Sequence, residues 1–311
     1  MTSSGGLEPF VVTTYGPSGI GKTTDMGYSF PTALFVAAPG ALSSVRSVCG
    51  YLPARAEDIN DIPSATKLIE REGASGKYQT VVIDDFSFLA EQTFAMLEKR
   101  YTGFKLWGAL RDVVLEFRNQ SRFAGMNVVL NCWEQGPKTR ANGQKVRGGP
   151  QLSGNLPEQL PAMCDVVLRA VHAPARQPWP SAYECTVNPA FNMKDRFNVA
   201  TRCSPAPMNL AELLRAAGHE IQRHPEIPQQ EEHVALIAAD LSGNTAEDAE
   251  KANAYFKELR SSGLGANAVR WTIRDAMDRA VIRRCLDQHD SMFLSPQATN
   301  PLLGIPGITR P

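Results

Sequence analysis

A nine-residue stretch near the start of the chain contains the residue types that hold a chain of phosphates. It follows the pattern glycine, four residues, glycine, lysine and threonine, and consists of Gly16, Pro17, Ser18, Gly19, Ile20, Gly21, Lys22, Thr23 and Thr24. The glycines allow consecutive backbone N–H groups to point at one phosphate, and a helix that begins here adds its partial positive charge. Lys22 would then reach the β and γ phosphates, and the Thr23 hydroxyl would bind Mg²⁺. The alternative is a glycine-rich turn that fits the pattern by chance.

A second candidate group lies about sixty residues further along the chain. The apolar run 80–83 predicts a buried strand, and it ends in Asp84 and Asp85. A parallel strand delivers such a carboxylate at its carboxyl edge, beside the phosphate loop, where it can hold a water on Mg²⁺. Many buried strands end in Asp, so this interpretation depends on the phosphate loop that precedes it. We expect Asp84 to be the metal-side acid and Asp85 its neighbour.

The elements that must position these groups alternate between strand and helix. The β-rich run 10–15 predicts the strand that feeds the phosphate loop, and a helix is predicted directly after the loop. Further strands are predicted at 32–38 and 126–132, and further helices at 64–72, 86–100 and 104–122. In the last of these helices, apolar residues that include Trp107 recur every three or four positions, so we expect this face to lie in the core. The alternation predicts an α/β fold with a mostly parallel sheet and helices on both sides.

Residues 135–150 form a glycine-rich segment with four cations and no acid. The cations are Lys138, Arg140, Lys145 and Arg147. Unopposed positive charge in a flexible loop attracts a nucleic-acid backbone. A solvated hairpin or a disordered lid explains the composition as well. The location favours nucleic-acid binding, because the segment begins at the carboxyl edge of a strand. There it would lie close to the γ phosphate of a bound nucleotide.

These motifs, in this order, resemble the short RecA-like ATPases of bacteriophages, a group that includes single-strand annealing proteins and recombinases. The likeness covers residues 8–217, and besides the phosphate loop and the basic segment it includes Val-Val-Ile-Asp-Asp-Phe-Ser at 81–87 and Asn-Val-Val-Leu-Asn-Cys-Trp-Glu at 127–134. It implies a RecA-like core in which Lys22 and Thr23 bind ATP and Mg²⁺. It further implies that Trp133 and Glu134 couple the γ phosphate to residues 135–150, and that these residues bind single-stranded DNA.

The same resemblance suggests a role for Lys194 and Arg196. In RecA-like assemblies, basic residues at this place reach the ATP of the neighbouring subunit. This implies a homo-oligomer, a ring or a filament, with ATP at the subunit interfaces. The alternative is that both cations are an ordinary pair on a surface hairpin.

One residue of the RecA-like pattern is missing. Such enzymes usually carry a glutamate just after the strand that follows the phosphate loop, where it orients the attacking water, but residues 37–40 read Ala-Ala-Pro-Gly. Either Asp85 or Glu134 replaces that glutamate, or the protein binds ATP and hydrolyses it slowly. Nucleotide binding is therefore the firmer expectation.

The composition indicates where in the cell the protein works, but it says little about the reaction that the protein performs. The 311 residues carry 32 Lys and Arg and 32 Asp and Glu, so the formal charge of zero argues neither for nor against nucleic acid. The six cysteines form no CxxC pair and the start of the chain shows no signal segment, which predicts a cytoplasmic protein, in the host cytoplasm if phage-encoded. No apolar run approaches the length of a membrane span, so no membrane partner is expected.

We expect a core at 1–217, a linker at 218–230, a helical appendage at 231–292 and a flexible tail at 293–311. In the appendage, helices are predicted at 231–241 and 266–289, and Thr245-Ala-Glu-Asp248 is predicted to form the capping box of a helix between them. His219 and His224 lie five residues apart, which is not the spacing of a zinc-binding pair on a helix.

Three functions fit the sequence. The first is an ATP-binding recombination protein that binds single-stranded DNA, promotes annealing or strand pairing, and has a single-strand-binding protein as a further partner. The second is an AAA-type phage replication or packaging ATPase, and the third is a nucleotide kinase. The basic segment favours the first, and the lack of an arginine-rich lid for an acceptor argues against the third.

Overall fold

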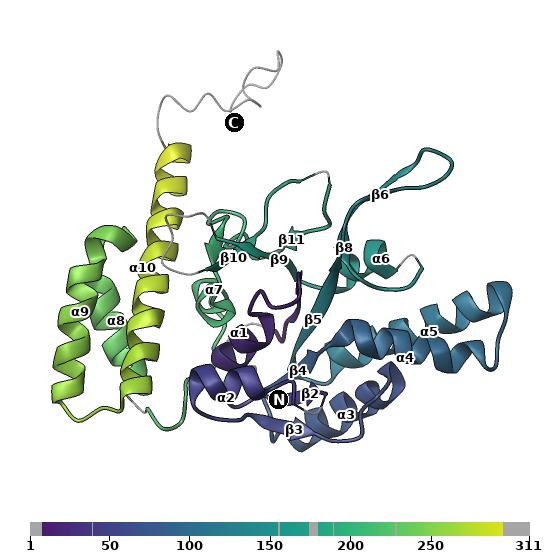
Figure 1. Cartoon of the computed structure of the whole chain (residues 1–311), viewed down its shortest axis with the longest axis horizontal. Coiled ribbons are helices and arrows are strands. Elements are labelled where there is room, and N and C mark those ends of the chain that lie inside the picture. Colours follow the sequence, from purple (N-terminus) through teal and green to yellow (C-terminus); the bar gives the residue numbers. More distant parts are fainter. Residues whose placement is uncertain are drawn as a thin grey trace, which may run out of the picture.

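A mixed sheet runs through the centre of the protein, and the predicted phosphate loop follows one of its middle strands (Figure 1). This computed structural model describes residues 8–38, 40–154, 156–173, 180–188, 190–227 and 229–294. The main path of the sheet has the strand order β12-β10-β9-β1-β5-β4-β2-β3. These strands are β1 (Val11–Gly16), β2 (Leu34–Ala37), β3 (Ala54–Ala56), β4 (Thr80–Asp84), β5 (Asn127–Gln135), β9 (Val166–His172), β10 (Ser181–Glu184) and β12 (Ala206–Pro207).

The register of the parallel strands brings the candidate groups to one edge of the sheet. β1 is parallel to β5, and Gly16 at its end pairs with Trp133. β4 is parallel to β5 and to β2, so that Asp84 lies between Asn131 on one side and Ala37 on the other. The phosphate loop and the acid at the end of β4 therefore share the carboxyl edge of the sheet, as the sequence predicts.

Helices cover both faces of the sheet. One face packs on α1 (Lys22–Ser29), α2 (Ser43–Cys49) and α7 (Leu210–Ala216). The other face packs on α3 (Ile62–Ser75), α4 (Phe86–Glu98), α5 (Gly103–Phe123) and α6 (Leu156–Met163). Because both faces are covered, every residue of β1 and of β4 is buried. The predicted α/β fold, a mostly parallel sheet with helices on both faces, is confirmed.

The first turns of α5 are more exposed to solvent than the sequence analysis predicts. Leu110, Val114 and Phe117 are buried, but Trp107 is 44% exposed and Phe104 is 97% exposed. The prediction that Trp107 faces the core is therefore wrong. The reason is geometric, since the first turns of α5 extend beyond the sheet that its later turns cover (Figure 1).

The C-terminal helices form a cluster with its own apolar core (Figure 1). They are α8 (Gln230–Asp240), α9 (Thr245–Ser261) and α10 (Ala266–Leu294). The predicted capping box at Thr245 is wrong, because the side chain of Asn244 caps α9 by accepting a hydrogen bond from the Ala246 N–H. Asp248 instead accepts bonds from the preceding turn, at Ser242 and Gly243. Residues 295–311, most of the predicted tail, lie outside the described residues.

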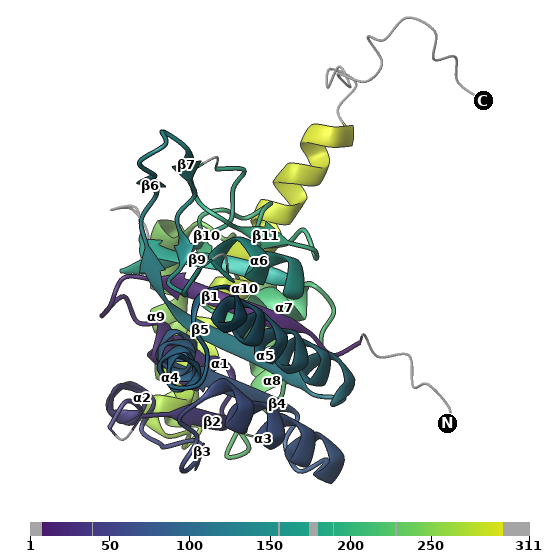
Figure 2. The same cartoon turned by 90° about the vertical axis from the view of Figure 1, so that its right-hand side faces the viewer.

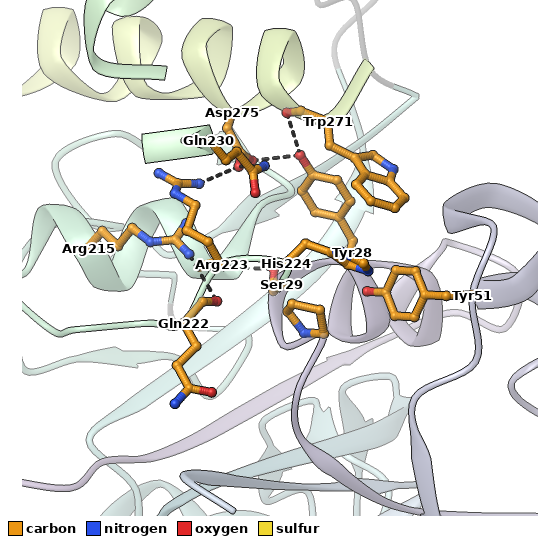
Figure 3. A pocket seen from close by; sticks show the side chains of 12 residues that line it. Tyr28, Ser29, Tyr51, Arg215, Gln222, Arg223, His224, Gln230, Trp271 and Asp275 are labelled. Carbon is orange, nitrogen blue, oxygen red and sulfur yellow. Dashed lines mark hydrogen bonds and ion pairs between the residues drawn. The ribbon is translucent and has the colours of Figure 1, made fainter. Parts of the chain in front are cut away.

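The segment predicted to be a linker is packed between the sheet and the C-terminal helices. The His219 ring lies 5.0 Å from the Phe10 ring, and the His224 ring lies 4.8 Å from that of Trp271 on α10. Figure 3 shows this junction, where the Tyr28 hydroxyl of α1 donates to Asp275 of α10 at 2.6 Å. α1, which follows the phosphate loop, is thus bonded directly to α10.

Among the described residues, no helix combines the length and the apolar character that crossing a bilayer requires.

Candidate functional site

The phosphate loop has the backbone that its glycines predict. Gly19 and Gly21 have φ angles of 79° and 101°, in the left-handed region that glycine enters without strain. Gly21 also precedes α1, and no side chain caps this helix. The N–H groups of the first turn of α1 are therefore free to bind a phosphate.

The Lys22 ammonium lies inside the loop. Its Nζ donates to the backbone oxygens of Gly16 at 2.8 Å and Pro17 at 2.9 Å. Burial lowers the pKa of Lys22, and the neighbouring Asp85 and Asp84 oppose this shift. A phosphate in the loop would give this cation a stronger, charged acceptor than two carbonyls.

Thr23 and Asp84, the predicted metal-side pair, are in direct contact. The Thr23 hydroxyl and the Asn131 amide both donate to the Asp84 carboxylate. Asp84 is 5% exposed, and burial raises its pKa against the lowering effect of these bonds and of Lys22. No cluster of three or more His, Cys, Asp or Glu side chains suited to a metal occurs in the described residues. This donor set fits Mg²⁺, which takes few protein ligands and keeps water and nucleotide oxygens.

Asp85 caps α4 and also faces the site. Its Oδ1 accepts bonds from the N–H groups of Ser87 at 2.7 Å and Phe88 at 3.4 Å. Burial, followed by the neighbouring charge of Asp84, raises the pKa of Asp85 to about 6. A carboxyl with a raised pKa is suited to exchange a proton near neutral pH.

Glu134 is held by a cation that the sequence analysis missed. Arg169 of β9 donates to both Glu134 oxygens at 2.9 Å and to Glu184 at 3.1 Å. Its guanidinium also lies 3.7 Å from the centre of the Phe191 ring. Since Arg169 pairs with Tyr15 across the strands, this group lies beside the phosphate loop. The available signal is a single arginine within the apolar run 166–171.

A cleft of about 560 Å³ opens beside Thr23 and Asp84. Residues 37–38, where the expected glutamate is missing, line it with two methyl groups. Glu57 and Asp58 line it from the end of β3. Asp58 has a φ of 60°, a left-handed conformation that is uncommon outside glycine. The sequence analysis missed these two acids, although they directly follow a short strand.

The basic segment is a hairpin, one of the two forms that the sequence analysis gives as alternatives to a flexible binding loop. β6 (Lys138–Thr139) pairs antiparallel with β7 (Lys145–Val146), and β8 (Gly149–Pro150) returns to pair with the end of β5. The four predicted cations Lys138, Arg140, Lys145 and Arg147 are all exposed. Figure 2 shows the hairpin extending beyond the body of the sheet. Backbone pairing thus presents these charges to solvent.

Lys194 and Arg196 lie at the other edge of the sheet. β11 (Lys194–Asp195) pairs with the start of β9, whereas the phosphate loop lies beyond the end of β1. The Lys194 Nζ donates to the backbone oxygens of Pro161 at 3.0 Å and Cys164 at 2.7 Å, and Arg196 forms an ion pair with Asp165 at 2.7 Å. Within one chain neither cation is near the loop, and a contact with the nucleotide of a neighbouring subunit stays a prediction.

A phosphate loop after a middle strand, with an acid at the end of a strand two places away, defines a P-loop ATPase domain. The chain belongs to the AAA domain family, whose model matches residues 8–197. Among solved structures it is similar to a KaiC-like protein of the hyperthermophilic archaeon Pyrococcus horikoshii OT3, at 15% identity and a TM-score of 0.35, over 58% of this chain and 79% of that chain. No curated protein sequence matches the chain.

Proposed function

We propose that this protein is an ATP-binding recombination protein of the bacteriophage RecA-like group that binds single-stranded DNA and promotes annealing or strand pairing. One observation carries the proposal, namely the position of the basic hairpin directly after β5. Trp133 of β5 pairs with Gly16 of the phosphate loop, and Lys138 follows it by five residues. The nucleotide site and a cationic surface are therefore joined by a very short length of backbone.

The charge of the hairpin supports a polyanionic partner. Lys138, Arg140, Lys145 and Arg147 lie on ten consecutive residues, and among the described residues no carboxylate forms an ion pair with any of them. Cations without acidic partners release the counterions of a phosphate backbone when they bind it. Because the hairpin projects, its cations can contact the phosphate backbone of a nucleic acid at points that a flat protein surface would not reach.

The nucleotide chemistry rests on residues that already touch one another. Lys22 would hold the phosphates, and Thr23 and Asp84 would hold Mg²⁺, which neutralises the charge that develops on a transferred phosphoryl group. Of the two candidates to orient water, Glu134 has both oxygens bound by Arg169, whereas the bonds of Asp85 to backbone N–H groups use Oδ1 alone. This difference favours Asp85. Slow hydrolysis is part of the proposal.

The proposal includes assembly into a ring or filament in which Lys194 and Arg196 approach the ATP of the next subunit. An AAA-type replication or packaging ATPase is the second candidate, because it would use the same phosphate loop and the same acid pair. A packaging motor of that class translocates on duplex DNA, and an annealing protein does not. Stimulation of hydrolysis by duplex rather than by single strands would therefore favour the second candidate.

The test is the fluorescence anisotropy of a labelled single-stranded oligonucleotide with ATP, with a slowly hydrolysed analogue and without nucleotide. We expect nucleotide to tighten binding in the natural protein, and Lys22→Ala to abolish that effect. Lys145→Ala with Arg147→Ala should weaken binding and lower its dependence on salt. Parent-like DNA affinity in this double variant would show that the hairpin is not the DNA site.

A further inference from the structure

Three aromatic side chains are exposed where α4 gives way to α5. Tyr101 is 41% exposed, Trp107 is 44% exposed and Phe104 is 97% exposed. We refer to these three residues as the aromatic tip. Large apolar side chains gathered on a surface are common where a partner binds. Neither the phosphate loop nor the ion pairs around it use this surface.

A groove lined by Lys138 of the basic hairpin lies close to Trp107 of the tip. The groove has a volume of about 410 Å³, and its polar lining side chains are Gln135, Lys138, Gln151, Ser153 and one acid, Glu91. Lys138 belongs to the hairpin itself, so the groove begins where the hairpin cations are. Gln135, Gln151 and Ser153 offer both donors and acceptors of hydrogen bonds.

Trp107 lies just beyond the part of the groove that Ser153 lines. Gly154 directly follows the lining residue Ser153, and a Cβ at position 154 would lie 2.6 Å from the Trp107 ring. Trp107 is also fixed from below by Phe94 of α4, with the two ring centres 5.2 Å apart. The indole is therefore held in place with one part of its surface open. Figure 1 shows the hairpin and the end of α5 projecting on the same side of the molecule.

We propose that the aromatic tip is a stacking platform for the bases of a single-stranded nucleic acid whose backbone is held by the basic hairpin. This inference rests on the proposed function. Proteins that bind single strands without reading the sequence use two features together. Cations follow the phosphate backbone, and aromatic rings stack on the bases. The charge supports this occupant, since Lys138 and the exposed Lys105 of α5 flank the surface. Duplex DNA does not fit, because its bases are already stacked.

The experiment compares Phe104→Ala with Phe123→Ala at the other end of the same helix. Phe123 is 83% exposed, so it is a matched control for losing an exposed ring from α5. We expect Phe104→Ala to weaken binding of a labelled oligothymidine by about fivefold to a hundredfold, with an unchanged salt dependence because no charge is removed. Phe123→Ala should stay within about twofold of the natural protein, as expected for a ring outside the site.

Photo-crosslinking of the natural protein provides a second measurement that needs no variant. An oligonucleotide containing 4-thiothymidine should crosslink to residues 101–107, as found by mass spectrometry. Parent-like binding by Phe104→Ala, with no crosslink in 101–107, would overturn the platform. If Lys145→Ala with Arg147→Ala lost oligonucleotide binding in the same measurements, the proposed function would still stand. If the natural protein bound no oligonucleotide and Phe104→Ala changed its sedimentation instead, the tip would be a contact between copies, and both proposals would be wrong.

Discussion

At the scale of single residues, the phosphate loop shows how far residue types and spacing can be trusted. Its nine positions predict the left-handed glycines, the uncapped α1 and the inward lysine, because each depends only on neighbours in the chain. Arg169 could not be predicted in the same way. Its role depends on Glu134 in one strand and Glu184 in another, and on the sheet that brings them together.

Lys22→Met tests the first of these residues. We expect the affinity for ATP to fall by about tenfold to a hundredfold, because a charge-assisted bond to phosphate is lost from a buried position. Isothermal titration calorimetry in the presence of Mg²⁺ measures this loss. The matched control is Lys67→Met, which removes an exposed lysine from α3 and should leave the affinity unchanged. Equal affinities for both variants would mean that nucleotide binds elsewhere.

Asp85 gives a prediction about pH. Its folded-state pKa of about 6 lies above the ordinary value of 3.8, so the folded state binds the proton more tightly than the unfolded state. The stability that this proton provides is present below about pH 4 and is lost as pH rises through about 6. Asp85→Asn should therefore gain stability relative to the natural protein between pH 4 and pH 7. Urea unfolding at several pH values measures the difference, and a difference independent of pH would contradict the shift.

Asp25 has a pKa raised to about 6 as well. Because it is present in both proteins, its contribution to the pH dependence cancels in the comparison. Asp58→Asn serves as the control variant, since it makes the same substitution at an exposed carboxyl.

At the scale of elements, the long buried strands are predictable from the sequence, and the short strands and the ends of helices are not. Buried strands such as β4 and β5 contain continuous apolar runs, at 81–83 and 128–130, and such a run is a local signal that the sequence shows directly. The face of α5 was assigned from periodicity alone, and periodicity does not tell where a helix passes beyond the sheet. Phe104 and Trp107 belong to the apolar stripe in sequence, yet only its later members are covered.

The start of α9 offers a test at this scale. Asn244→Ala should lower the free energy of unfolding by about 1 kcal/mol, because it removes the acceptor for the Ala246 N–H. Thr245→Ala should cost less than half of that, since position 245 lies inside the helix. Circular dichroism during urea unfolding measures both. If Thr245→Ala lowered the free energy of unfolding more than Asn244→Ala, the capping box predicted from the sequence would be correct.

At the scale of the whole molecule, a buried network of charges joins the nucleotide-binding core to the C-terminal helices. Arg274 of α10 lies 3.7 Å from Asp25 of α1 and 3.6 Å from Asp278, and its guanidinium is 4.2 Å from the centre of the Tyr28 ring. In the sequence the arginines of α10 are interleaved with aspartates, a pattern that usually marks a solvated face. Two of these partners, Asp25 and Tyr28, lie about 250 residues away in the sequence, so no local pattern could reveal them.

Arg274→Met should destabilise the protein by about 3–5 kcal/mol, because the carboxylates of Asp25 and Asp278 would stay buried without this charge. The control is Arg270→Met on the same helix, an exposed arginine whose loss should change little. Differential scanning calorimetry measures both variants. Equal melting temperatures would mean that the junction contributes little to stability.

The bond between Tyr28 and Asp275 has a practical consequence for anyone who wishes to isolate the ATPase domain. The family match ends at residue 197, which invites cutting the gene there or shortly after. A protein shortened in that way would expose the face of α1 that packs on α10. Asp25 would lose Arg274 and would lie beside apolar side chains that are now exposed to solvent. We expect such a fragment to precipitate during purification, so the smallest well-behaved ATPase should retain α10.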